Sequence, residues 1–218
     1  MSLRGIISRA ARIKLRILLR LHNSLYVVIS RLAIIAENGL HPKHRLMNYH
    51  AFFADNIAAG DSVLDIGCGN GFLTSDIAGK AGAVTAVDMS QANIDFARRN
   101  FNRDNIEYIC GDATCLEMGR KFDVITLSNV LEHIENRIEF LRKTGELADR
   151  LLIRVPVVDR DWLTLYKREL GVEYRLDLTH RIEYTLEGFK EELAAAGLRI
   201  ENASIRFGEI WAVVGRSR

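Results

Sequence analysis

Short apolar runs alternate with amphipathic stretches through residues 60–155, and this alternation constrains the fold more than any other feature of the chain. The apolar runs, which read as strands, are residues 63–66, 83–87, 106–110, 122–127 and 151–155. Helical periodicity follows most of them, at residues 72–79, 91–101 and 137–148. Strands that are apolar at nearly every position and separated by helices indicate a parallel sheet that is covered on both faces.

The C-terminal part of the chain breaks this alternation. A helix predicted over residues 186–196 stops at Gly197, and two further strands, 198–207 and 210–214, meet around Gly208 with no room for a helix between them. Strands joined this closely pair in antiparallel fashion. We therefore expect an α/β fold with a doubly wound, seven-stranded, mostly parallel sheet, a C-terminal antiparallel hairpin and preceding N-terminal helices.

The first 45 residues differ from the rest of the chain in charge. They carry nine bases and one acid, a net charge of +8, whereas residues 46–218 carry a net charge of −6. At ~100° per residue, the bases and the apolar side chains of residues 3–35 fall on opposite sides of a helix, so one or two amphipathic helices are expected there. We divide the chain into a basic helical arm, residues 1–45, and a main domain, residues 46–218, which opens with a helical pattern at residues 44–57.

Two features bear on the compartment of the protein. The longest uncharged run near the start, residues 21–30, is about half of the ~20 apolar residues that a spanning helix needs, so no transmembrane segment is expected, and the arginines exclude a secretory signal. Cys68, Cys110 and Cys115 form no C-x-x-C pair and are expected to be small buried side chains in a reducing compartment. These features predict a cytoplasmic protein, with peripheral attachment to a membrane as an open alternative.

The first strand ends in a glycine-rich turn, Asp65-Ile66-Gly67-Cys68-Gly69-Asn70-Gly71. In a doubly wound sheet, ligands bind beyond the carboxyl ends of the strands, at the point where the strand order reverses. Glycines permit positive φ and let a ligand approach the backbone, and a carboxylate at the strand end can hold an ammonium group. Because Phe72 follows and no Gly-Lys-Ser/Thr is present, this is neither a G-x-G-x-x-G dinucleotide turn nor a P-loop.

The turn resembles the first motif of the class I, Rossmann-like S-adenosylmethionine-dependent methyltransferases of the small-molecule type, and the likeness extends in register over about residues 46–215. It implies that Asp88, at the end of the second strand, binds both ribose hydroxyls, and that Asp112, after the third, accepts from the adenine amino group. Residues 128–134, after the fourth strand, would close over the methionine part of the cofactor. The cofactor-binding residues implied are Asp65, Gly67, Cys68, Gly69, Asn70, Asp88, Met89, Asp112, Ala113, Ser128 and Asn129.

Methyl transfer, the activity that the resemblance implies, is an in-line displacement in which the protein mainly positions the nucleophile, and we expect neither a covalent catalytic residue nor a metal. An oxygen nucleophile would benefit from a general base. His133 and His180 are the candidates, because unperturbed histidines titrate near ~6.5. For each of them a packing or capping role remains open.

The expected acceptor is a small-molecule, lipid-linked or glycan group that is methylated at oxygen. Enzymes that methylate the amino groups of adenine, cytosine or glutamine resemble one another in an Asp/Asn-Pro-Pro-aromatic run after the fourth strand, where this chain reads Ser128-Asn129-Val130-Leu131. Nucleic-acid methylation is therefore less favoured. Residues 157–185 are longer than a plain crossover, and they form either a substrate lid or a surface helix that packs Trp162, Leu165 and Tyr166 on the core.

Three explanations remain open for the basic arm. Residues 41–57, with Tyr49 and His50, are placed to cap the cofactor pocket. Residues 1–36 could instead lie on an anionic membrane or form a homodimer interface. Two other functions also remain open, namely an RNA-modifying methyltransferase that uses the arm, and a non-catalytic cofactor-binding subunit that activates a partner.

Overall fold

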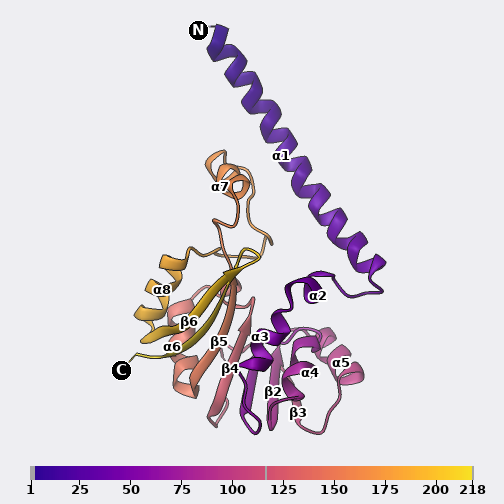
Figure 1. The fold of residues 1–218 in the computed structure, drawn as a ribbon, viewed down its shortest axis with the longest axis vertical. Helices are drawn as coiled ribbons and strands as arrows, with labels where there is room; N and C mark the ends of the chain where they lie inside the picture. Colours follow the sequence, from indigo (N-terminus) through magenta and orange to yellow (C-terminus); the bar gives the residue numbers. More distant parts are fainter. Residues whose placement is uncertain (1–2, 116, 218) are drawn as a thin grey trace.

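The computed structural model describes residues 3–115 and 117–217. Residues 1 and 2 of the predicted arm and residues 116 and 218 of the predicted main domain lie outside the described residues. Its centre is a seven-stranded sheet in the order β3-β2-β1-β4-β5-β7-β6 (Figure 1). The strands are β1 (Ser62–Ile66), β2 (Ala83–Asp88), β3 (Ile106–Cys110), β4 (Phe122–Ser128), β5 (Ala148–Pro156), β6 (Leu198–Arg206) and β7 (Glu209–Arg216). The first five strands are parallel, and β7 runs antiparallel to both β5 and β6. The predicted fold class is confirmed.

Helices cover both faces of the sheet. They are α3 (Tyr49–Asp55), α4 (Phe72–Ala78), α5 (Gln91–Asn100), α6 (Arg137–Leu147) and α8 (Leu186–Ala195). Strand β1 shows why both faces must be covered, because Val63 packs into the hydrophobic cluster beneath α3 and α4, whereas Leu64 packs into the cluster beneath α6 and α8. Both side chains are fully buried. Burial on both faces explains why the strands are apolar at nearly every position.

Two element boundaries differ from the sequence-based expectation. The helix expected at residues 44–57 is divided into α2 (Lys43–Met47) and α3 by Asn48, which has φ 49°. Asparagine tolerates this left-handed conformation, and its polarity alone does not reveal the break. Strand β5 begins at Ala148, three residues before the expected start, because Ala148 pairs with Phe122 of β4.

The N-terminal arm forms one helix, α1 (Leu3–Ala36), which projects away from the sheet (Figure 1). Among the described residues, the segment Ser8–Ala36 is long and apolar enough to cross a membrane by length and composition, since its most apolar window has a mean hydropathy of 1.3. The sequence analysis considered only the uncharged run between Arg20 and Arg31, whereas a window of 18 residues that includes these two bases is still apolar enough. The expectation that no segment crosses a membrane stays a prediction.

The cysteine prediction was only partly correct. Cys68 is buried beneath the glycine-rich turn, whereas Cys110 and Cys115 are exposed. Both exposed thiols lie at the end of β3 or just beyond it, and β3 is an edge strand of the sheet, so no neighbouring strand covers that side.

Candidate functional site

The turn between β1 and α4 contains three glycines with positive φ, namely Gly67, Gly69 and Gly71. A Cβ atom on Gly67 would lie 2.6 Å from the side chain of Val130, and one on Gly71 would lie 2.8 Å from Ala97. These two glycines are therefore required by packing. A Cβ atom on Gly69, by contrast, would meet nothing within 4 Å, so the backbone there faces open space that a ligand can approach.

A cavity of about 380 Å³ adjoins this turn. Its wall contains seven of the predicted cofactor residues, which are Asp65, Gly67, Cys68, Gly69, Asn70, Ser128 and Asn129. The remaining wall comes from α4 and β5 and from the chain between the end of α1 and α3, including His44 and Tyr49. The structure thus places the segment before β1 over the cavity. This is the position that the first explanation, a cap formed by residues 41–57, requires.

Asp65 is a buried carboxylate in the wall of this cavity. One of its oxygens accepts a hydrogen bond from the Thr74 hydroxyl at 2.6 Å and the other accepts from the Thr126 hydroxyl at 2.7 Å. Burial raises the pKa of Asp65 to about 6, although the two hydroxyls oppose the shift. Because ionising this buried carboxyl is costly, a bound ammonium group would stabilise its ionised form.

Asp88 lies half-buried at the carboxyl end of β2, directly beside the turn. Its carboxylate accepts from the backbone N–H of Gly69 at 2.9 Å and from the N–H of Ser90 at 2.9 Å. The Asn93 side chain donates to it as well, at 3.1 Å. These bonds hold the carboxylate in one orientation, which is the condition for recognising a diol with directional hydrogen bonds.

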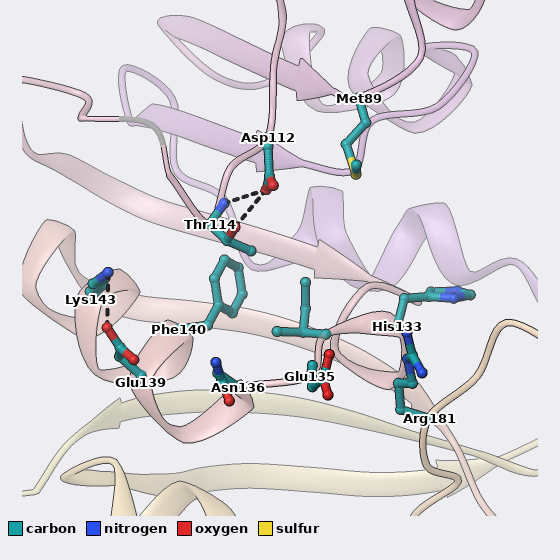
Figure 2. A pocket seen from close by; sticks show the side chains of 11 residues that line it. Met89, Asp112, Thr114, His133, Glu135, Asn136, Glu139, Phe140, Lys143 and Arg181 are labelled. Carbon is teal, nitrogen blue, oxygen red and sulfur yellow. Dashed lines mark hydrogen bonds and ion pairs between the residues drawn. The ribbon is translucent and has the colours of Figure 1, made fainter.

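A second cavity, also of about 380 Å³, lies further along the same edge of the sheet. Figure 2 shows that Met89, Asp112 and His133 line it. Asp112 is exposed, and its Oδ1 accepts from the backbone and the hydroxyl of Thr114, so this residue also stabilises the local turn. Ala113 lines neither cavity and packs against the core instead.

His133 and His180 come together in space, with ring centroids 4.8 Å apart. The hydroxyl of Thr179 donates to Asp177 at 2.7 Å, so its oxygen is free to accept from His133 Nδ1 at 3.0 Å. This arrangement places the proton of a neutral His133 on Nδ1 and leaves Nε2 as the basic atom. Partial desolvation of the ring by neighbouring protein atoms and the adjacent His180 lower the pKa of His133, which favours the neutral form.

His180 is buried, in contrast to the exposed His133. Its Nδ1 lies 3.3 Å from a carboxylate oxygen of Glu183. Of the two predicted histidines, His133 is therefore the one that lines the second cavity, and His180 lies behind it.

Glu132 was not among the predicted site residues. It is fully buried, neither carboxylate oxygen has a hydrogen-bond partner among the described residues, and burial raises its pKa to about 8. Potential ligand atoms of Glu132, His133 and His180 lie within 4.8 Å of one another, a donor set that could hold a metal ion. The sequence analysis expected no metal, and that expectation remains untested.

Arg154 of β5 is a further residue whose place in the site was not predicted. It is 4% exposed, its Nε donates to Asn129 at 2.6 Å, and its guanidinium lies 3.5 Å from the centroid of the Tyr49 ring. Its Nη1 atom has no partner among the described residues. The Tyr49 hydroxyl in turn lies 2.6 Å from His44 Nδ1. In the sequence, Arg154 reads only as part of the strand at residues 151–155, because its contact with residues 44–49 depends on the fold.

Comparison with known proteins connects this site to a family. Residues 63–149 match the family model described as a methyltransferase domain. The chain is 38% identical over 91 residues to the mitochondrial ubiquinone biosynthesis O-methyltransferase of Schizosaccharomyces pombe, an alignment covering 39% of this chain and 33% of that protein. It is 29% identical over 179 residues to the ubiquinone biosynthesis O-methyltransferase of Stutzerimonas stutzeri, covering 76% and 77% of the two chains. The chain spans about a third to a half of the length of the other curated relatives, 33% and 53% for those of Schizosaccharomyces pombe and Coxiella burnetii.

Solved structures share the fold at low sequence identity. The DhpI–SAH complex matches with a TM-score of 0.64 at 19% identity and covers 91% of this chain and 97% of its own. Magnesium protoporphyrin IX methyltransferase from Synechocystis, solved with bound SAH, matches with a TM-score of 0.61 at 21% identity, covering 81% and 83% of the two chains. These likenesses show a shared fold.

Proposed function

We propose that this chain, which belongs to the class I S-adenosylmethionine-dependent methyltransferases, transfers a methyl group from that cofactor to an oxygen atom of a small-molecule acceptor. The observation that carries the proposal is the open backbone at Gly69, which lies beside two oriented carboxylates, those of Asp65 and Asp88. The open backbone at Gly69 lets the cofactor approach the turn, the Asp65 carboxylate can pair with an ammonium group, and the Asp88 carboxylate can accept from a diol. The cofactor carries both of these groups.

The residues present fit the cofactor. Asp65 would pair with its ammonium group, because burial raises the pKa of this carboxyl and a bound cation would offset the cost of ionising it. Asp88 would accept from the ribose hydroxyls, and Met89 and Asp112 would contact the adenine from the second cavity. The bound cofactor would supply an electrophilic methyl group.

The protein's own part in the reaction is to position the acceptor and to hold a proton. His133 lines the second cavity, and its Nε2 is the atom left free by the contact with Thr179. This nitrogen would accept the proton of the acceptor hydroxyl as the oxygen attacks. His180, which lies behind His133, would keep the ring in place.

The choice of oxygen as the methylated atom rests on the relatives. Several of them are ubiquinone biosynthesis O-methyltransferases, and one alignment of this kind covers 76% of the chain. The RNA-modifying and non-catalytic alternatives remain predictions, as do a homodimer and a cytoplasmic location.

The direct test is to incubate the full chain with S-adenosylmethionine and a phenolic ubiquinone-precursor analogue, and to measure S-adenosylhomocysteine release and the methylated product by mass spectrometry. We expect an O-methylated product that is reduced in the His133→Gln variant. Tight cofactor binding together with methylation of nitrogen, or of RNA in place of the phenol, would contradict the proposed acceptor.

A further inference from the structure

Helix α1 carries an uncovered apolar face. Six of its aliphatic side chains, each more than half exposed, are Leu18, Leu21, Leu25, Ile29, Leu32 and Ile35. At ~100° per residue, the first five fall within an arc of about 80°. Such a continuous apolar stripe on a helix that projects from the sheet (Figure 1) is unusual for a surface in water.

The opposite side of α1 is attached to the main domain. Leu19 packs against Leu170 and Val172, at the end of α7 (Trp162–Glu169) and just beyond it. The Asn23 side chain accepts from Lys167 Nζ at 2.7 Å and donates to the Glu173 carbonyl at 2.7 Å. The middle of the helix is therefore held against the domain, and the apolar stripe faces away from it.

The charge of α1 indicates what covers the stripe. The helix contains seven bases and no acid. Arg20 and Arg31 lie between the attached side and the apolar stripe when placed at ~100° per residue, where long side chains can reach the headgroups of anionic lipids. A second copy of the chain would instead bring the bases of two such helices together without an acid in either, which is unfavourable.

The attachment also decides how the helix lies. A spanning orientation would draw Lys167 and the polar segment around Glu173 into the hydrocarbon, because both are bonded to the middle of α1. An orientation parallel to the surface leaves these groups in water and buries only the stripe.

We propose that α1 lies in the plane of an anionic phospholipid bilayer, with its leucine and isoleucine stripe in the acyl region and the main domain above it. The chain after α1 continues into the first cavity, whose wall includes Ile34 and Leu40. The cofactor site therefore lies next to the membrane, and an amphiphilic acceptor can be taken from the bilayer surface. This last step rests on the proposed function, whereas the binding to lipid does not.

Vesicle co-sedimentation of the full chain tests the proposal, with vesicles of phosphatidylcholine alone or mixed with phosphatidylglycerol. We expect binding to the mixed vesicles that falls with salt, and a loss of about fivefold for each base removed in Arg20→Gln and Arg31→Gln. The double variant Leu25→Glu/Ile29→Glu should lose more than about tenfold, because two charges would enter the acyl region. Ile138→Glu, an equally apolar-to-acidic change at an exposed site on α6, is the matched control and should bind as the unaltered chain does.

Three outcomes would overturn the proposal. One is equal vesicle binding by the unaltered chain and the Leu25→Glu/Ile29→Glu variant, and a second is resistance of the bound protein to alkaline carbonate, which would indicate a spanning helix. The third is a dimer in light scattering that dissociates in the same variant without any binding to vesicles. Affinity for S-adenosylhomocysteine, measured on every variant, checks folding and reports separately on the proposed function.

Discussion

The pKa of Asp65 makes cofactor binding depend on pH. In the free protein this carboxyl is half protonated near pH 6, and only the ionised form pairs with an ammonium group. We expect affinity for S-adenosylhomocysteine to rise between about pH 5 and pH 7 and then to level off. Calorimetry across this range measures it. In Asp65→Asn the affinity should be weaker and the pH dependence should disappear; an unchanged pH profile would show that another group titrates.

Asp65 also affects the stability of the free protein. Its folded-state pKa lies above the ordinary value of 3.8, so folding favours the protonated form, and the stability that it contributes is lost as the pH rises through about 6. Without ligand, Asp65→Asn should therefore melt higher relative to the unaltered protein at pH 8 than at pH 4. Thermal denaturation at the two pH values checks the sign.

Asp88 is predicted to contribute directly to cofactor affinity. Replacing it by Asn should cost about 1.5–3 kcal/mol of binding free energy, roughly 10- to 150-fold, because charged hydrogen bonds are lost. Asp104→Asn, an exposed acid before β3, is the control, since Asp88 accepts from the Gly69 N–H of the turn and Asp104 lies away from it. Equal affinity of the Asp88 and Asp104 variants for S-adenosylhomocysteine would remove Asp88 from the ribose site.

The contact between Thr179 and His133 predicts a positioning role. Changing His133 to Gln should lower kcat by about 100-fold, the usual contribution of a general base. Thr179→Val should lower kcat less and leave cofactor affinity unchanged, because it removes only the group that fixes the Nδ1 proton. A Thr179→Ser variant retains the hydroxyl and should recover the rate. If it does not, the lower kcat of Thr179→Val results from altered packing and not from the lost hydrogen bond.

At the scale of elements, the turn after β1 contains two kinds of glycine. Gly67 is required by packing, whereas Gly69 faces the space that a ligand can occupy. Gly67→Ala should destabilise the fold by about 2 to 4 kcal/mol, since it combines positive φ with a close contact to Val130. Gly69→Ala has positive φ but no close contact, so it should cost about 1 kcal/mol of stability and still weaken cofactor binding. Urea denaturation and calorimetry on both variants measure the contrast, and equal losses of stability would contradict it.

Strands were easier to predict than the segments between them. A buried parallel strand is apolar along its length, so β1, β2 and β4 stand out in the sequence, and the closing hairpin follows from chain length alone. The break at Asn48 depends on one backbone angle that has no hydrophobic signature. For residues 157–185, the alternative in which Trp162, Leu165 and Tyr166 pack on the core fails at Trp162, which is 73% exposed on the surface of α7.

At the scale of the whole molecule, the sheet order explains which site residues the sequence revealed. Asp65 and Asp88 lie at the carboxyl ends of β1 and β2, Asp112 lies just after β3, and neighbouring parallel strands bring these ends to one edge. Arg154 and Tyr49 are more than 100 positions apart in the chain and meet only because α3 packs beside β5 and β7. Glu132 could not be identified either, because its lack of partners becomes visible only in the folded structure.

The central claim is that the cavity beside Gly69 binds S-adenosylmethionine, and calorimetric titration of the full chain with S-adenosylhomocysteine, beside NAD, tests it most directly. The account predicts micromolar binding of S-adenosylhomocysteine at pH 7.5, weakened in Asp88→Asn, and no heat of binding for NAD. Binding of NAD in preference to S-adenosylhomocysteine, or no binding of S-adenosylhomocysteine by a chain that is shown to be folded, would contradict it.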